Sequence, residues 1–184
     1  MYRAMRYDFL IDSYDSERVK VLSVWSEFRH DDLPVRPGTW FRTMLGVDVG
    51  APPLPDVETR LEFIKQYAED SGRRLERLRR TADHWWEEQT RFFDVSRSRA
   101  WVMTRRLTHT SHHRGQQMAM LRMLGRELHS NYGPTADTGG LVQNHAPTIY
   151  AYSGVDALLE GERRGGAKSP LPRATGIALT ERPF

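Results

Sequence analysis

Residues 61–78, LEFIKQYAEDSGRRLERL, have the pattern of a long bundle helix. Small or apolar residues recur along one side of the segment at alternating steps of three and four: Leu61, Ile64, Ala68, Ser71, Leu75 and Leu78. Such steps return to one face of an α-helix, and arginines and glutamates cover the opposite face. We therefore expect a helix that follows an N-cap at Asp56 and runs to about Ala82.

Two further segments have helical patterns. Residues 7–28 carry apolar side chains at steps of three, four or seven, and the prolines and glycine of PVRPG (34–38) end any helix there. Residues from Ser96 or Ser98 to about Leu124 form the third pattern, with Gly125 as the terminating glycine. Gly115, in the middle of this pattern, suggests that a neighbouring element approaches closely. The predicted fold class is all-α.

Composition and charge narrow the class of protein. The 184 residues are 39% hydrophobic and 28% charged, as in one soluble globular domain. The net charge is +3, but acidic residues are interleaved with the arginines, so no basic patch indicates nucleic acid. There is no cysteine, which excludes disulfides, thiolate ligands and a cysteine nucleophile. The N-terminus lacks the apolar core of a signal peptide, and no apolar run is long enough for a membrane span. We expect a cytoplasmic protein with no membrane partner.

Three of the seven histidines lie within residues 107–117, LTHTSHHRGQQ. His109 and His113 are four residues apart, so on a helix they lie one turn apart on the same face and can converge on one cation. The predicted inward stripe of this helix contains Val102, Arg106, both histidines, Gln116 or Gln117, Met120 and Leu124. Arg114 and Gln116 are expected near the open coordination side. The alternative is a solvated face whose histidines bond to their neighbours.

Glu17 lies on the apolar stripe of the first predicted helix. The simplest interpretation is a partly exposed side chain that reaches solvent. The alternatives are a buried hydrogen-bonding partner or a group that orients a metal ligand. It is also the nearest candidate for a general base, although no motif supports that role.

The histidine run HTSHHRGQ (109–116), with MAMLRMLG (118–125) after it, resembles the last bundle helix of the DinB-like (damage-inducible, YfiT-related) metal-binding family. The stretches WFRTMLG (40–46), FFD (92–94) and GPTADTGG (133–140) are similar to one bacterial branch of that family, so the resemblance covers most of residues 5–160. It implies a four-helix bundle of up-down-down-up order, often dimeric, that holds a divalent metal with three histidines.

On this resemblance His109 and His113 match the two ligands of the last long helix. The third ligand belongs to the second helix, ahead of the segment that matches Trp40, and this chain passes from Gly38 to Trp40 without a histidine. The second helix is therefore expected to be shortened. Three explanations remain open: His30 substitutes as ligand, the site is lost, or the working protein contains a segment that this sequence lacks.

The expected domain is a DinB-like bundle at residues 1–160, with an extended or poorly ordered tail at 161–184. The expected function is a divalent-metal-dependent enzyme of hydrolase or thiol transferase type, which binds zinc, nickel or manganese through His109 and His113 and acts on a small molecule as a homodimer. The alternative is a non-catalytic helical protein for dimerisation or partner binding, whose metal site is incomplete.

Overall fold

The computed structural model describes residues 5–29, 44–50, 55, 57–126, 128–140 and 142–172. These residues are mostly helical, as the sequence predicts, but they also contain a two-stranded antiparallel sheet that the all-α prediction did not include. The helices are α1 (Asp8–Glu27), α3 (Arg60–Leu78), α4 (Asp83–Glu87), α5 (Arg99–Met123) and α6 (Val155–Arg163), and the strands are β1 (Gln89–Phe92) and β2 (Val95–Ser98). Short 3₁₀ turns occupy Ala136–Thr138 and Val142–Asn144.

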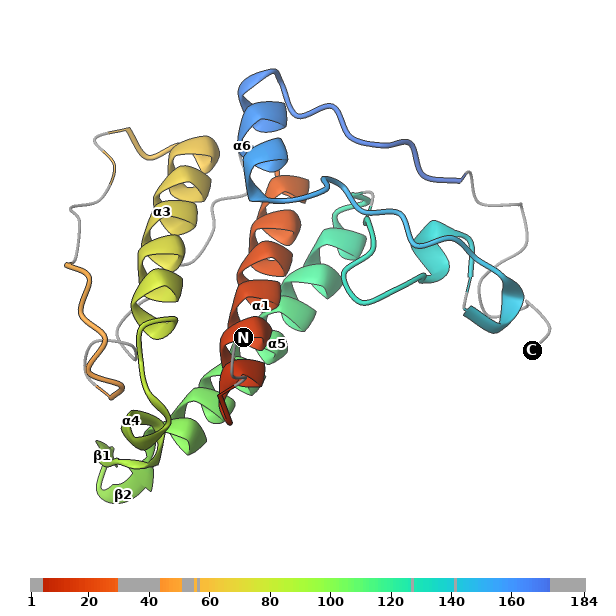
Figure 1. Ribbon diagram of the computed structural model, residues 1–184. Helices are drawn as coiled ribbons and strands as arrows, with labels where there is room; N and C mark the ends of the chain where they lie inside the picture. Colours follow the sequence, from red (N-terminus) through yellow and green to blue (C-terminus); the bar gives the residue numbers. More distant parts are fainter. Residues whose placement is uncertain are drawn as a thin grey trace, which may run out of the picture.

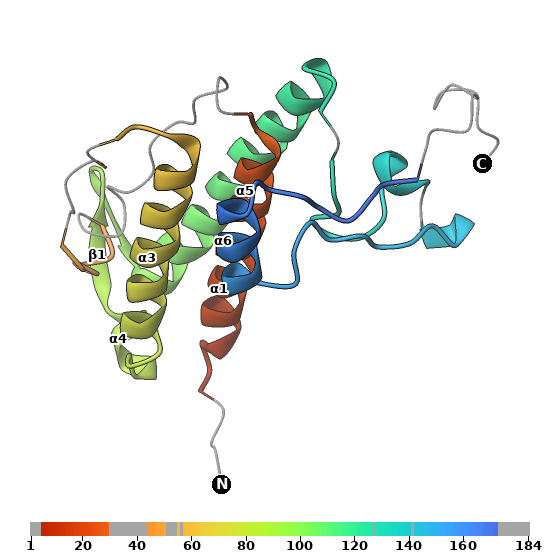
Figure 2. The same ribbon diagram turned by 90° about the horizontal axis from the view of Figure 1, so that it is seen from above.

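Helix α1 is the centre of the packing. It contacts α3, α5 and α6, and the four helices can be followed in Figure 1 and, from above, in Figure 2. It contributes buried side chains to all three hydrophobic clusters. Leu10 belongs to the cluster that includes Trp86 of α4, Leu22 to the cluster with α3 and α6, and Val24 to the cluster with Leu121 of α5. A helix that is apolar on several sides must be covered on several sides, which explains its central place.

Helix α3 confirms the stripe predicted from residues 61–78. Ile64, Ala68, Ser71, Leu75 and Leu78 are all buried. The N-cap, however, is Thr59, whose hydroxyl accepts a hydrogen bond from the Glu62 amide at 3.2 Å; the predicted cap Asp56 lies outside the described residues. The helix also ends at Leu78, before the predicted Ala82, where the Thr81 hydroxyl donates to the Leu78 carbonyl oxygen at 2.6 Å.

The aromatic connection between α3 and α5 is a short helix and a hairpin. Trp86 of α4 is fully buried in the cluster at this end of α1. Phe92 pairs with Val95, so the hairpin turn consists of Phe93 and Asp94, and Phe93 has a positive φ of 53°. Two-residue hairpin turns usually contain Asn-Gly or Asp-Gly. Their absence here explains why the sequence did not predict the strands.

Helix α5 begins and ends where predicted but buries a different face. Ser98 is the N-cap, and Gly125 follows the helix with a φ of +64°. The buried side chains are Val102, Met103, Arg114 and Leu121, whereas Met120 is 55% and Leu124 45% exposed. The predicted inward stripe holds for Val102, Arg106 and His109, which are buried or half-buried, but from His113 onward it was wrong by about one residue, or 100° of rotation. Among the described residues, no atom lies within 4 Å of a Cβ built on Gly115, so none of them makes the predicted close approach.

The chain beyond residue 150 packs on the helices through α6, which the sequence analysis missed. This helix crosses the predicted boundary at 160 and brings the buried Glu162 to Arg60 at the start of α3, with 2.5 Å between Nη1 and Oε2. The segment after α6 has no regular secondary structure, and in it the Lys168 ammonium group donates a hydrogen bond to the Ser26 carbonyl oxygen at 2.9 Å. Residues 161–172 are thus attached to α1 and α3; 173–184 lie outside the described residues.

Besides the N-cap at Asp56, two further predictions fall on residues that the structure does not describe. His30 and the junction between Gly38 and Trp40, where the second helix was expected to be shortened, lie in the range 30–43. None of the helices in the described ranges is both long and apolar enough to span a membrane.

Candidate metal site and the polar pocket beside it

Helix α5 brings His109 and His113 together as the four-residue spacing predicts. Their Nε2 atoms are 3.1 Å apart, and the two rings meet nearly edge to face. The Nδ1 atom of His113 lies 2.9 Å from the side-chain carbonyl oxygen of Gln116. Because that oxygen can only accept, Nδ1 of His113 is the donor in this hydrogen bond, and in the neutral ring Nε2 then has a lone pair directed at His109. Gln116 therefore orients the ring, as partners behind metal-bound histidines do.

The spacing of the two Nε2 atoms fits a shared divalent cation. Two imidazole nitrogens bound at about 2.0–2.1 Å and at tetrahedral or octahedral angles are about 2.8–3.4 Å apart. The 3.1 Å separation lies inside this range, and it is also the length of a hydrogen bond between the two rings, as the alternative of a solvated histidine face expects. Partial burial, then His113 and Arg106, lower the pKa of His109, which favours the neutral ring that a metal requires.

Only two ligands converge within the described ranges. No group of three or more His, Cys, Asp or Glu side chains that could hold a metal occurs there. The exposed ring of His112 has its centroid 5.3 Å from that of His113 and belongs to the next face of α5. The described part of the chain thus offers a two-histidine site with open positions, and the proposed substitute ligand His30 lies outside it.

The histidine pair lies at the margin of the packed surface of α5. His109 is half-buried and His113 is exposed, so the expectation that both point into the core was wrong for His113. Arg114, expected beside the open coordination side, is 1% exposed and points toward α1 instead. Two consecutive residues of α5 therefore differ sharply: the His113 imidazole faces solvent, and the Arg114 guanidinium is buried.

Glu17 of α1 is the partner of Arg114, and it is buried, not partly exposed as the sequence analysis favoured. Its carboxylate also accepts hydrogen bonds from Ser111 at 2.9 Å, Tyr132 at 2.8 Å and Lys20 at 3.2 Å. Burial raises the pKa of Glu17, but Arg114 and the hydroxyl donors together lower it by more than burial raises it, so the net shift is downward. A saturated carboxylate with a lowered pKa is a poor general base, and Glu17 instead joins α1 to α5.

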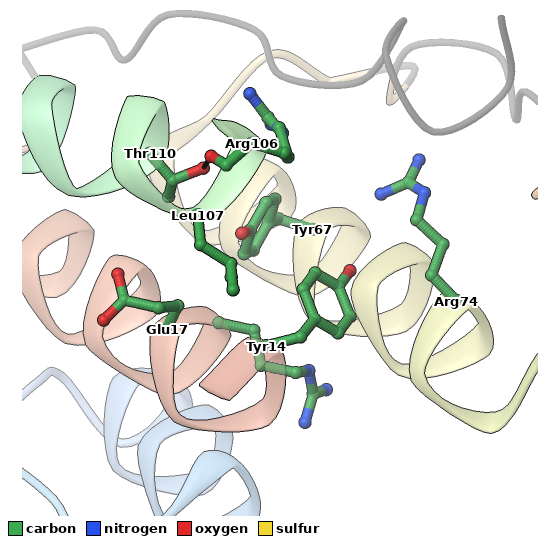
Figure 3. Close-up of a pocket in the computed structure, with 8 residues that line it drawn as sticks. Tyr14, Glu17, Tyr67, Arg74, Arg106, Leu107 and Thr110 are labelled. Carbon is green, nitrogen blue, oxygen red and sulfur yellow. Dashed lines mark hydrogen bonds between the residues drawn. The ribbon is translucent and has the colours of Figure 1, made fainter. Parts of the chain in front are cut away.

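A polar pocket lies between α1, α3 and α5, on the side of α5 next to the histidines. Figure 3 shows the rings of Tyr14 and Tyr67 near its centre, with Arg106 and Arg74 on either side. The space holds about one water molecule. Arg106 is one helical turn before His109, and its charge is among those that lower the pKa of that histidine. The sequence analysis noted Arg106 as part of a stripe but did not predict the pocket, because two of its helices are far apart in the chain.

Comparisons with known proteins found no matching family model, no matching curated protein and no matching solved structure.

Proposed function

We propose that this chain binds a divalent metal ion through His109 and His113 and acts as a DinB-like, metal-dependent enzyme. The observation that carries the proposal is the 3.1 Å separation of the two Nε2 atoms, with the lone pair of His113 held in place by Gln116. Zinc, nickel and manganese are the candidate ions, since imidazole suits borderline transition metals. A bound ion would supply Lewis acidity to a small-molecule substrate in a hydrolase or thiol transferase reaction.

The finer architecture belongs to the same proposal. The motif resemblance implies a four-helix bundle of up-down-down-up order with a shortened second helix, cytoplasmic and dimeric. Helices α3 and α5 both pack against α1, and these three helices are compatible with three members of such a bundle. A third ligand would come from residues 30–43, where His30 is the one histidine, or from a partner subunit.

Metal analysis of the tag-free protein tests the proposal. After incubation with zinc, nickel or manganese and removal of free ions, wild type should retain about one ion per chain or per dimer, as structural stoichiometry requires. His109→Ala, His113→Ala and the double variant should lose it. His112→Ala is the matched control, because that ring is exposed on the same helix but does not join the pair.

The outcome that contradicts the proposal is equally direct. Metal content far below stoichiometry for all three ions would contradict metal binding by this chain. Metal content unchanged in the double variant would contradict binding through His109 and His113. Circular dichroism of each variant separates loss of the site from loss of the fold, and the exposed position of His113 makes misfolding of that variant unexpected.

A non-catalytic role in self-association is a second candidate, favoured by apolar side chains on the last turns of α5. Met120 is 55%, Met123 87% and Leu124 45% exposed, about two to three helical turns beyond His113. Exposed apolar patches of this kind mark protein interfaces. Light scattering should then give a dimer mass that Met123→Glu reduces to a monomer mass, with Met118→Leu unchanged. A monomer at high micromolar concentration contradicts this candidate.

A further inference from the structure

The segment that follows α6 is held on the surface by a few side-chain groups. Figure 1 shows it, in blue, leaving α6 and passing the Glu27 end of α1 toward the 3₁₀ turns. Ser169 is exposed, and within the described ranges no backbone-to-backbone hydrogen bond joins residues 167–172 to another element. At the far end Pro172 lies beside Gly139, since a Cβ built on that glycine would be 3.6 Å from the proline ring. The position of the segment therefore depends on specific side-chain contacts.

Lys168 is the first anchor of this segment. Its ammonium group donates to the Ser26 carbonyl oxygen at 2.9 Å and lies 3.3 Å from Oε1 of Glu162. Glu162 also accepts a hydrogen bond from the Tyr152 hydroxyl at 2.6 Å and pairs with Arg60. Burial raises the pKa of Glu162, but these three partners together lower it by more, so the carboxylate is ionised at neutral pH. No histidine of the described residues takes part in this anchor.

His129 is the second anchor and binds the next residue of the segment. Its ring is buried, with Nε2 2.7 Å from the Ser169 carbonyl oxygen and Nδ1 2.7 Å from Oε1 of Glu27. A carbonyl oxygen and a carboxylate can only accept, so both contacts are hydrogen bonds only while the ring carries two protons. Burial lowers the pKa of His129, but the bonds to Glu27 and Ser169 raise it by more.

Loss of one proton from His129 must break one of these two bonds. The neutral ring has a single N–H group, and the Glu27 carboxylate is the stronger acceptor because it is charged. The proton therefore stays on Nδ1, and Nε2 turns a lone pair toward the Ser169 carbonyl oxygen, which repels it. The Glu27 side chain is only 6% exposed, whereas Ser169 is exposed, so water can replace the lost donor at Ser169. The bond to the segment is the one that breaks.

We propose that His129 is a pH-dependent latch: its imidazolium form holds the Ser169 carbonyl at the end of α1, and its neutral form releases the segment from Ser169 onward. Two charged groups of opposite sign act on the ring, Glu27 from α1 and Lys168 from the segment itself. A raised pKa keeps the imidazolium above the ordinary value of about 6.5, so release occurs as the pH rises through the folded-state value. Lys168 stays bound to Ser26 and is the hinge. The proposal does not depend on a metal at His109.

Digestion of the folded full-length protein by a lysine-specific endoprotease tests the latch. The chain has three lysines, and two of them, Lys20 and Lys65, lie within α1 and α3. Cleavage after Lys168 requires the segment to leave the surface. The cleavage rate is measured from about pH 6 to about pH 9, a range that begins below the ordinary histidine pKa. Division by the rate for the free peptide 162–175 removes the pH dependence of the protease. This ratio should rise about tenfold or more, the effect of losing a charge-assisted hydrogen bond.

Variants at the latch assign the effect to its residues. His129→Gln has no titrating ring, so its cleavage ratio should not change with pH. Glu27→Gln keeps the ring but removes the carboxylate that raises its pKa, so the rise should move to lower pH. His112→Gln, at an exposed histidine of α5, is the matched control and should behave as wild type. In an NMR titration, the histidine resonance that is missing from His129→Gln should titrate over the pH range in which the ratio rises.

Three results would overturn the proposal. The first is a ratio that stays constant with pH in wild type, and the second is an equal rise in His129→Gln. The third is cleavage at Lys20 and Lys65 that rises in parallel with cleavage at Lys168, which would report opening of the whole fold. If circular dichroism shows that His129→Gln does not fold, the shift in Glu27→Gln and the NMR titration decide. Metal-free protein is used throughout, so these results do not bear on metal binding by the histidines of α5.

Discussion

Two neighbouring faces of α5 differ in solvent exposure, although the residues of the two faces are interleaved in the sequence. His113 and Gln116 are exposed, whereas Arg114, one residue after His113, is 1% exposed and paired with Glu17 of α1. Successive helical residues differ by about 100° in direction, which is enough to separate core from solvent. The comparison teaches that the buried face holds the helices together, while the exposed face carries His113, one of the two candidate metal ligands.

The largest expected effect comes from breaking the buried face. Arg114→Met should lower the free energy of unfolding by about 3–5 kcal/mol, because it removes the buried cationic partner of the Glu17 carboxylate and leaves Lys20 as its one remaining ion-pair partner among the described residues. Urea denaturation followed by circular dichroism measures it. Arg105→Met, on the exposed side of α5, is the control and should cost under about 0.5 kcal/mol. A loss of less than about 1 kcal/mol for Arg114→Met would mean that the pair contributes little.

A second buried charge lies at His129 and contrasts with the exposed histidines of α5. Its ring is 2% exposed, and its two nitrogens each lie 2.7 Å from an acceptor, the Glu27 carboxylate and the Ser169 carbonyl oxygen. Two acceptors require two N–H donors, so the bound form is the imidazolium. Burial alone lowers the pKa of His129, but the bonds to Glu27 and Ser169 raise it more.

The sign of the pH dependence follows. A raised folded-state pKa stabilises the protein fully below the unfolded value of about 6.5, and this contribution is lost as the pH rises through the folded value. The difference in Tm between wild type and His129→Gln should therefore shrink as the pH rises above about 6.5. His112→Gln, on the exposed face, should show no such trend. A difference that is constant or grows with pH would contradict the imidazolium.

Metal addition sharpens the exposed side of the comparison. A ligand that binds only the folded state at ten times its Kd stabilises it by about 1.4 kcal/mol. Zinc, nickel or manganese should raise the Tm of wild type, and EDTA should reverse the rise. The effect should vanish in His109→Ala/His113→Ala and persist in His112→Ala. Equal stabilisation of the double variant would place the ion elsewhere.

The smallest expected effect concerns the glycine between the two faces. Gly115→Ala should stabilise the protein by about 0.4–1 kcal/mol, since none of the residues that the structure describes lies within 4 Å of the added Cβ and alanine is the better helix former. Gly161→Ala in α6 is the counterpart: its Cβ would collide with the Tyr152 ring, and we expect a loss of about 1–3 kcal/mol. Thermal unfolding of both variants distinguishes them, and stabilisation by Gly161→Ala would be the contrary result.

Local rules predicted a good part of the structure. The stripe of α3, the termination of α5 at Gly125 and the convergence of His109 with His113 all depend on side chains within a few residues of each other. The hairpin was missed because its Phe93-Asp94 turn lacks the usual residues, and α6 was missed because its stability depends on contacts such as that of Glu162 with Arg60. Short elements of this kind are stabilised by tertiary contacts more than by propensity.

The sequence by itself therefore determined the long helices and the pairing of two histidines on one of them, because i, i+4 neighbours are set by helix geometry alone. Only the tertiary structure decided which face of α5 is buried, since that depends on the surface α1 presents, with Glu17 ready to receive Arg114. It also assembled the polar pocket from α1, α3 and α5. Charges far apart in the chain become neighbours only through packing, and no local pattern encodes that meeting.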